Sequence, residues 1–164
     1  MFKRIITVLL SFFTVLSMQA ELLQAVSWTS NHKLTSDNEG IMEFTATIEP
    51  GFHMYDMNAE GGPTPLSFTW EKLDGVELIG TPTPSEASLV QFDPVFNVNI
   101  GWWEGSVTLT QKFVAKKSEY SITGHLRYAA CSDETCTPPT VENFNFSGKA
   151  KVADATNDAA AVVA

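Results

Sequence analysis

The chain has 164 residues, a net charge of −9 at neutral pH, 11 phenylalanines and 4 tryptophans. This length fits one domain of ordinary size, and the aromatic content is sufficient for a large hydrophobic core without help from cross-links. The acidic balance argues against nucleic acid or an anionic membrane as a partner.

The first twenty residues have the pattern of a secretory signal peptide, in which Lys3 and Arg4 precede an apolar run. The run is too short to span a bilayer, and no other long apolar run follows. Loss of this segment, with two basic residues and no acidic one, would change the net charge from −9 to −11. We therefore expect an exported, periplasmic protein without stable membrane insertion. Its expected parts are a signal peptide at residues 1–20, one domain at residues 21–148 and a flexible, Ala-rich tail at residues 149–164.

Most of the domain has the pattern of short β-strands separated by turn-forming residues. Apolar and polar side chains alternate along each expected strand, and no segment shows a helical period. The expected strands cover residues 42–48, 52–57, 66–71, 76–79, 107–114, 121–128 and 141–146. Residues 81–85 contain two prolines and are expected to be a connection. The pattern predicts an all-β, immunoglobulin-like β-sandwich of about seven to eight strands.

Other motifs give weaker signals. An aromatic segment at residues 92–97, followed by Trp102 and Trp103, is interpreted either as a loop at the core edge or as a lid over a reactive site. His32, His53 and His125 lack the spacing of a metal site, so we expect no metal and no other cofactor.

The only two cysteines, Cys131 and Cys136, have four residues between them. We expect a β-hairpin with Ser132 to Thr135 as its loop, in which the two cysteines face each other and form a disulfide. Directly opposed Cβ atoms lie about 4.5–5.5 Å apart, whereas a relaxed disulfide prefers about 3.8 Å. The bond is therefore expected to be strained and, where it is exposed, readily reduced.

A structural cross-link is the first interpretation of such a pair, because most disulfides of secreted proteins are structural. Against it, closure of so short a loop contributes only about 2 kcal/mol of stability. A domain rich in aromatic residues can fold without this contribution. The spacing by itself leaves both a structural and a redox role open.

Three segments resemble the N-terminal periplasmic domain of the thiol:disulfide interchange protein DsbD, and together they extend from Ala25 to Ser147. Residues 128–139, which contain both cysteines and two prolines, are similar to the active-site hairpin of that domain. Residues 51–55 resemble its glycine-aromatic-x-x-Tyr strand. Residues 92–109 align with its cap-loop region, so that Phe96 stands where the family has the phenylalanine that covers the disulfide.

The sequence also departs from the family beside the expected site. One residue fewer lies between the cysteines than in the best-known member. His53, two positions before Tyr55, stands where that member has tyrosine. Asp93 is the only acidic residue left in the cap loop, because Pro94 and Val95 replace the others. The tuning of the thiols is therefore expected to differ from that of the family.

The resemblance implies thiol–disulfide exchange of the protein-disulfide reductase type. In the family the later cysteine forms the mixed disulfide, which corresponds to Cys136, and Cys131 would then release the partner. The implied partners are thioredoxin-like periplasmic proteins or a membrane electron donor. Asp133 and Glu134 are expected to disfavour a thiolate, because like charge raises the pKa of a thiol.

Two other functions stay open beside this one. The first is a non-catalytic, secreted binding or scaffold domain with a structural disulfide, in which the aromatic residues form an interface. The second is a thiol-dependent chaperone or metallochaperone. The resemblance favours thiol–disulfide interchange over both.

Overall fold

The computed structural model describes residues 24–59, 61–93 and 96–152, and the signal peptide expected at residues 1–20 lies outside these ranges. Every regular element in the described residues is a β-strand, and there are eleven of them. None of these residues forms a helix long and apolar enough to cross a membrane. The expected all-β class is confirmed, and the larger number of strands reflects several short strands at one end of the molecule.

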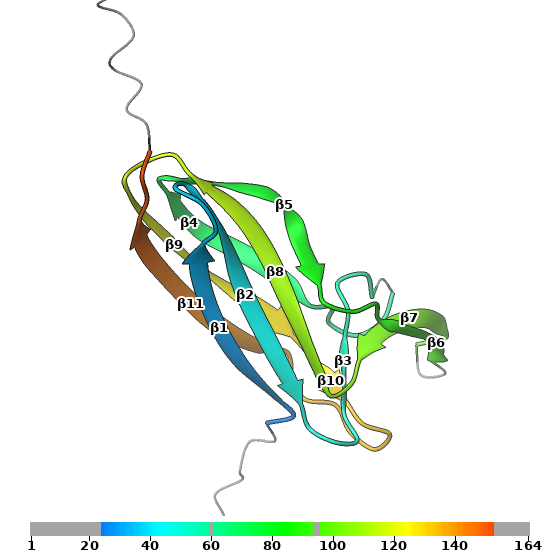
Figure 1. Ribbon diagram of the computed structural model, residues 1–164. Helices are drawn as coiled ribbons and strands as arrows, with labels where there is room; N and C mark the ends of the chain where they lie inside the picture. The colour runs from blue at the N-terminus through cyan, green and yellow to red at the C-terminus, as the bar shows by residue number, and fades with distance from the viewer. Residues whose placement is uncertain (1–23, 60, 94–95, 153–164) are drawn as a thin grey trace, which may run out of the picture.

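The largest sheet has four antiparallel strands in the order β1-β2-β8-β5 (Figure 1). Its strands are β1 (Val26–Leu34), β2 (Glu39–Ile48), β5 (Val76–Pro84) and β8 (Ser106–Ala115). Buried and more exposed positions alternate strictly along the middle of β2 and β8, where Phe44 is opposite Leu109. One face of the sheet is thus apolar and covers the core, as the sequence pattern predicted.

A second sheet, in the order β11-β9-β4, packs against the apolar face of the first. Its strands are β4 (Ser67–Asp74), β9 (Glu119–Tyr128) and β11 (Thr140–Lys149). The ring of Phe44 lies 4.9 Å from that of Phe144 and 5.1 Å from that of Phe68, so that aromatic side chains join the two layers. The two sheets form the expected β-sandwich, and neither cysteine belongs to its main core.

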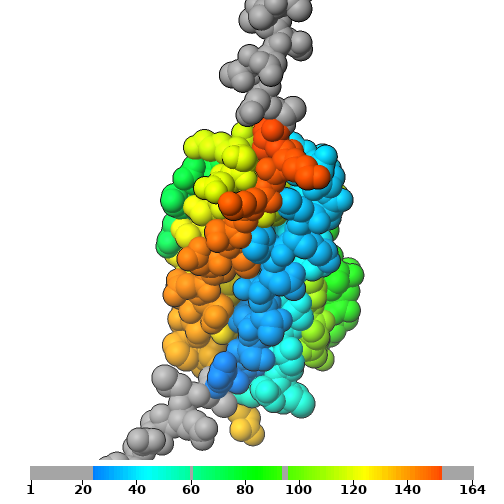
Figure 2. Space-filling view, turned by 60° about the vertical axis from the view of Figure 1, so that its left-hand side comes forward, coloured from blue at the N-terminus to red at the C-terminus, as the bar shows by residue number. Residues whose placement is uncertain are grey.

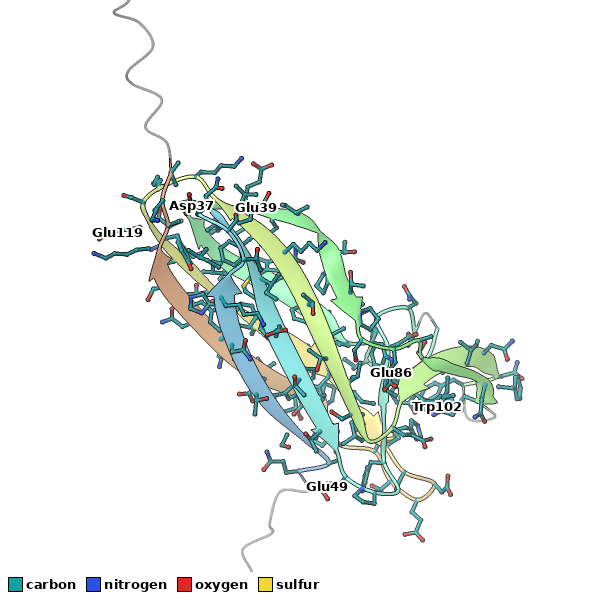
Figure 3. All side chains as sticks on the ribbon, in the orientation of Figure 1. Asp37, Glu39, Glu49, Glu86, Trp102 and Glu119 are labelled. Atoms are coloured by element: carbon teal, nitrogen blue, oxygen red, sulfur yellow. A yellow bond between two sulfur atoms is a disulfide. The ribbon has the colours of Figure 1, made fainter. Side chains whose placement is uncertain are left out.

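A third, small sheet stands at one end of the sandwich (Figure 1). Its order is β10-β3-β7-β6, with β3 (His53–Tyr55), β6 (Leu89–Asp93), β7 (Val98–Trp103) and β10 (Ala130–Cys131). β6 and β7 pair as a hairpin, which we call the cap hairpin (residues 89–103). Of the aromatic segment at residues 92–97, Phe92 and Asp93 end β6, and Phe96 and Asn97 form a turn before β7. Side chains at this end, Glu86 and Trp102 among them, lie far from Asp37 and Glu119 at the opposite end (Figure 3).

The prediction of a connection at residues 81–85 is wrong, because β5 continues to Pro84. Pairing with β8 is interrupted between Ile79 and Thr83, and the buried Gln111 fills the gap by donating hydrogen bonds to the carbonyls of Ile79 and Gly80. β5 is an edge strand, where proline is tolerated because one side of the backbone needs no ladder partner.

The described chain ends at residue 152, with its two ends at opposite ends of the sandwich (Figure 2). β1 and β11 lie side by side along one edge of the molecule. Beyond β11, the N–H of Ala150 donates to the carbonyl of Ser118, and the N–H of Lys151 donates to that of Asp37. Residues 149–152, which the sequence analysis assigned to the tail, are thus bonded to the domain, while residues 153–164 lie outside the described ranges.

Candidate functional site

The small sheet has two faces with different surroundings. One face packs into the main core through Met54, Trp103 and Ala130. Neighbouring positions point the opposite way, because side chains alternate across a sheet. They bring together Cys131, His53, Tyr55 and Trp102, and we call this second side the disulfide face.

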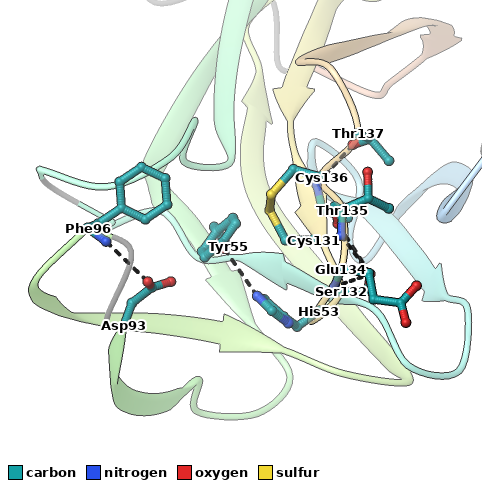
Figure 4. The surroundings of a disulfide bond; sticks show 11 residues. His53, Tyr55, Asp93, Phe96, Cys131, Ser132, Glu134, Thr135, Cys136 and Thr137 are labelled. Carbon is teal, nitrogen blue, oxygen red and sulfur yellow. Dashed lines mark hydrogen bonds between the residues drawn. A yellow bond between two sulfur atoms is a disulfide. The ribbon is translucent and has the colours of Figure 1, made fainter.

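Cys131 and Cys136 form a disulfide, and they pair as an antiparallel bridge with their Cα atoms 4.0 Å apart (Figure 4). The predicted placement of the two cysteines opposite each other is confirmed. The turn between them is closed by Ser132, whose N–H donates to the carbonyl of Thr135 at 2.8 Å and whose hydroxyl accepts the N–H of Thr135 at 3.2 Å. Short side chains with local hydrogen bonds therefore hold the loop that carries the disulfide.

The two cysteines differ in their access to solvent. Cys131 belongs to β10, is paired with β3 and is 3 % exposed. Cys136 is exposed, and the chain after Thr137 passes through Pro138 and Pro139 before β11 begins. Thr137 itself is buried, its N–H donates to the Ala130 carbonyl at 2.8 Å, and its hydroxyl accepts the Ala130 N–H at 3.1 Å. The two prolines beyond it lack the N–H that a ladder needs.

His53 and Tyr55 form a hydrogen-bonded pair beside the disulfide (Figure 4). Nε2 of His53 lies 3.1 Å from the Tyr55 hydroxyl, and the imidazole packs on the ring of Trp102 with 4.8 Å between centroids. Tyr55 is 2 % exposed and belongs to the same small buried cluster as Cys131 and Ile100. The imidazole is thus held between two aromatic side chains on the disulfide face.

Burial and nearby charge set the ionisation of this pair. Burial lowers the pKa of His53 below its usual 6.5, while the carboxylates of Glu104, Asp93 and Asp133 partly offset this effect. Burial, together with Asp93, raises the pKa of Tyr55 to about 12. At neutral pH the imidazole is therefore uncharged and the phenol keeps its proton.

The cap hairpin presents Asp93 and Phe96 at its tip. The Asp93 carboxylate accepts the N–H of Phe96 at 3.2 Å, and Asn97 completes the turn with a φ of 56°. Such a positive φ is tolerated by asparagine more readily than by most residues. Phe96 is half-buried against the cluster of Tyr55 and Cys131, and in Figure 4 its ring lies across Tyr55 from the disulfide.

An open groove of about 470 Å³ runs between the cap hairpin and the disulfide hairpin. All the residues that the sequence marked as site candidates line it: Cys131, Cys136, Phe96, Asp93, His53 and Tyr55. Three carboxylates, those of Asp93, Glu104 and Asp133, also line it. Within residues 24–59, 61–93 and 96–152, no group of three or more His, Cys, Asp or Glu side chains could hold a metal ion.

The sequence analysis did not identify Asp56 and Ser88, which form a hydrogen bond beside the groove. Asp56 is 5 % exposed, and its carboxylate accepts the hydroxyl of Ser88 at 2.6 Å and the N–H of Asn58 at 2.8 Å. A β-carbon at Gly101 would collide with this carboxylate, so glycine is required there. An aspartate after a short strand resembles an ordinary surface residue, and no signal in the sequence connects it to Ser88.

Comparisons with known proteins fit this geometry. The family model described as "Thiol:disulfide interchange protein DsbD, N-terminal" matches residues 19–148. Among curated proteins, none matches the sequence at a significant level. The reduced N-terminal domain of DsbD from Neisseria meningitidis aligns with a TM-score of 0.50 and 19% identity, over 77% of this chain and 87% of that chain.

Two further solved structures are similar at lower scores. The N-terminal periplasmic domain of ScsB from Proteus mirabilis has a TM-score of 0.49 and 15% identity, over 74% of this chain and 50% of that chain. A complex between the DsbD N-terminal and PilB N-terminal domains from Neisseria meningitidis has a TM-score of 0.45 and 17% identity, over 80% of this chain and 90% of that chain.

The structural likeness to the reduced DsbD domain concerns the fold, since the identity is only 19%. The family match is more informative, because it spans the whole sandwich, the cap hairpin and both cysteines. The chain therefore belongs to the family of N-terminal domains of the thiol:disulfide interchange protein DsbD.

Proposed function

We propose that this domain carries electrons by thiol–disulfide exchange through the Cys131–Cys136 pair. The observation that carries the proposal is the unequal access of the two cysteines, with Cys131 buried and Cys136 exposed at an open groove. Exposed disulfides are the readily reduced ones, and a partner sulfur must reach one sulfur of the pair in line. Membership of the DsbD N-terminal family supports the same chemistry.

In the reducing half of the cycle, a donor thiolate attacks Sγ of Cys136. A mixed disulfide forms between the donor and Cys136, the bond between the two cysteines breaks, and Cys131 leaves as a thiolate that takes up a proton. The second thiol of the donor loses its proton and attacks the donor sulfur of the mixed disulfide. The donor leaves oxidised, and the domain holds two thiols.

In the delivering half, the Cys136 thiolate attacks a disulfide of the client protein and releases one client thiolate. Cys131 then loses its proton and attacks Sγ of Cys136, which restores the internal disulfide and releases the second client sulfur. Two electrons pass to the client in each cycle, and no cofactor takes part. The buried Cys131, held by β3, is suited to this resolving role because it stays within reach of Cys136.

Phe96 and Asp93 have the cap role in this proposal. Phe96 limits the approach of small thiols to the disulfide from the side of the cap hairpin until a partner displaces the tip of that hairpin, and Asp93 orders the tip through its bond to the Phe96 N–H. The partners are thioredoxin-like periplasmic proteins or a membrane electron donor. The carboxylates along the groove favour partners that carry positive charge around their reactive cysteine.

Export to the periplasm is part of the same proposal. The basic and apolar pattern of residues 1–20 supports cleavage near Ala20, and an oxidising compartment holds the client disulfides that such a carrier would reduce. A domain from residue 21 to about residue 148 then acts as the carrier unit.

The reduction potential of the pair separates this function from a scaffold domain with a structural disulfide. Equilibration with mixtures of reduced and oxidised dithiothreitol, followed by alkylation, is expected to give a potential above about −300 mV. Far-UV circular dichroism should change little on reduction, because the main core contains no cysteine. A potential well below that value, or collapse of the fold on reduction, would assign the disulfide a structural role.

A further inference from the structure

We propose that His53 accepts the proton of Cys131, through the Tyr55 hydroxyl, when Cys131 resolves a mixed disulfide at Cys136. The inference rests on the proposed thiol–disulfide exchange and assigns the proton acceptor within this site. Three observations support it: the placement of His53, its charge state and the environment of Cys131.

The first observation is the register of the small sheet. His53 on β3 is directly opposite Cys131 on β10, and such antiparallel partners point to the same face with Cβ atoms about 4.5–5.5 Å apart. Tyr55 lies two positions further along β3 on that face, in one buried cluster with Cys131, and its hydroxyl is hydrogen-bonded to Nε2 of His53. The phenol and the imidazole are therefore bonded to each other on the same face of the sheet as the buried Cys131.

The second observation is the charge around the imidazole. The groups that face His53 come from four directions: Asp93 on the cap hairpin, Glu104 after β7, Asp133 in the disulfide loop and Tyr55 on its own strand. Glu49 lines an adjoining groove that His53, Glu104 and Asp133 also line. Burial lowers the pKa of His53, so the imidazole is neutral and able to accept a proton at neutral pH. The same carboxylates stabilise the imidazolium once it has formed.

The third observation is the environment of the thiol itself. Burial of Cys131 and the carboxylate of Asp133 both disfavour a thiolate, which is the nucleophilic form. Among the described residues that line the groove there is no lysine or arginine to stabilise it. A paired imidazole is the usual means of activating a cysteine in such surroundings.

The proton and the electrons balance in this step. The Cys131 S–H bond breaks as the Tyr55 hydroxyl takes up that proton and gives its own to Nε2 of His53. The resulting thiolate attacks Sγ of Cys136, the mixed disulfide breaks, and the partner leaves as a thiolate. The imidazolium then returns its proton to solvent or to the departing sulfur.

The test follows the second step without any protein partner. One equivalent of dithionitrobenzoate is added to the reduced protein, and the release of coloured thiolate is followed by stopped flow from about pH 5 to pH 9. The first release reports attack by Cys136, and the second reports resolution by Cys131. The Cys131→Ala variant, which gives only the first release, identifies the two phases.

His53→Gln and Tyr55→Phe are each expected to slow the second phase about tenfold or more at pH 7. In His53→Gln the remaining rate should rise steadily with hydroxide concentration, whereas the wild-type rate should level off above the pKa of His53. Added imidazole should restore part of the rate in His53→Gln. His125→Gln, which replaces an imidazole paired with Glu71 on the sandwich, is the matched control and should leave both phases unchanged.

An unchanged second phase and pH profile in either His53→Gln or Tyr55→Phe, with circular dichroism confirming the fold, would overturn the inference. This outcome is distinct from failure of the proposed function. If the pair were structural, the reduction potential of the wild-type protein would lie well below −300 mV or its fold would collapse on reduction, whatever the rates in the two variants.

Discussion

The hydroxyl of Ser88 donates a hydrogen bond of 2.6 Å to the Asp56 carboxylate, although the two residues are 32 positions apart in the chain. Asp56 directly follows β3, which holds His53 and Tyr55, and Ser88 directly precedes β6. The backbone N–H of Asp56 also donates to the carbonyl of Gly101 on β7. The buried carboxylate thus fastens the cap hairpin to the strand that carries the site.

Ser88→Ala is expected to lower the free energy of unfolding by about 1.5–3 kcal/mol, because it removes a hydrogen bond to a buried charged group. Amide hydrogen exchange in the cap hairpin should accelerate more than in β2 or β8. Ser67→Ala, at an exposed serine on β4, provides the matched control and should change neither quantity. Equal exchange in the two variants would show that this bond does not hold the hairpin.

Phe96→Ala is expected to speed the reaction of the disulfide with small thiols and to destabilise the fold only modestly, because Phe96 is half-buried. Leu89→Ala truncates an apolar side chain that is 50 % exposed on the same hairpin and does not line the groove, and it should leave the rate unchanged. If Phe96 were a core residue instead, its truncation would cost about 3–5 kcal/mol and give no gain in reactivity.

The stability of the domain should depend on pH through His53. Its pKa is lowered in the folded state, so the unfolded chain binds this proton first as the pH falls. The folded state therefore loses stability as the pH decreases through about 6.5, and the loss is complete below the folded pKa. Urea unfolding at about pH 7.5 and pH 5.5 should show a smaller difference for His53→Gln than for wild type. His125→Gln should keep the wild-type difference, and a wild-type response in His53→Gln would contradict the assigned direction.

The carboxylates along the groove should make the disulfide selective for the charge of an attacking thiol. Cysteamine, which is cationic, is expected to react about tenfold faster at low salt than the anionic mercaptoethanesulfonate, after correction for their thiolate fractions. High salt should reduce this ratio. Asp133→Asn should lower the ratio, whereas Asp37→Asn, at the opposite end of the sandwich, should preserve it (Figure 3). A ratio near one in the wild-type protein would rule out this effect.

Much of the fold could be predicted from local patterns, because alternation along β2 and β8 reflects burial of one face. The disulfide hairpin could also be predicted from the sequence, because the two cysteines and the polar loop between them are close in the chain. The small sheet was predicted only in part: the strand expected at residues 52–57 contains β3, but β10, with only two residues, was not expected as a separate strand. Strands of this length carry too little periodicity to be recognised, and their pairing depends on the tertiary structure.

The candidate site was likewise predicted in part from the sequence. Both cysteines, Tyr55 and Phe96 could be named from a family resemblance, and His53 was visible as a departure from it. The direct pairing of His53 with Cys131 and the bond between Asp56 and Ser88 depend on contacts between distant segments. Prolines were also misleading in β5, where an edge position tolerates them.

The most direct test of the account is the capture of partners by single-cysteine variants. Cys131→Ala leaves the exposed Cys136 without its resolving thiol, and this variant should accumulate stable mixed disulfides with thioredoxin-like proteins from a periplasmic extract. Cys136→Ala should capture far less, because Cys131 is 3 % exposed. Non-reducing gels and mass spectrometry identify the captured proteins, and the variant that lacks both cysteines sets the background. Equal capture by both variants would remove the assignment of roles, and no capture by either would contradict the proposed thiol–disulfide exchange.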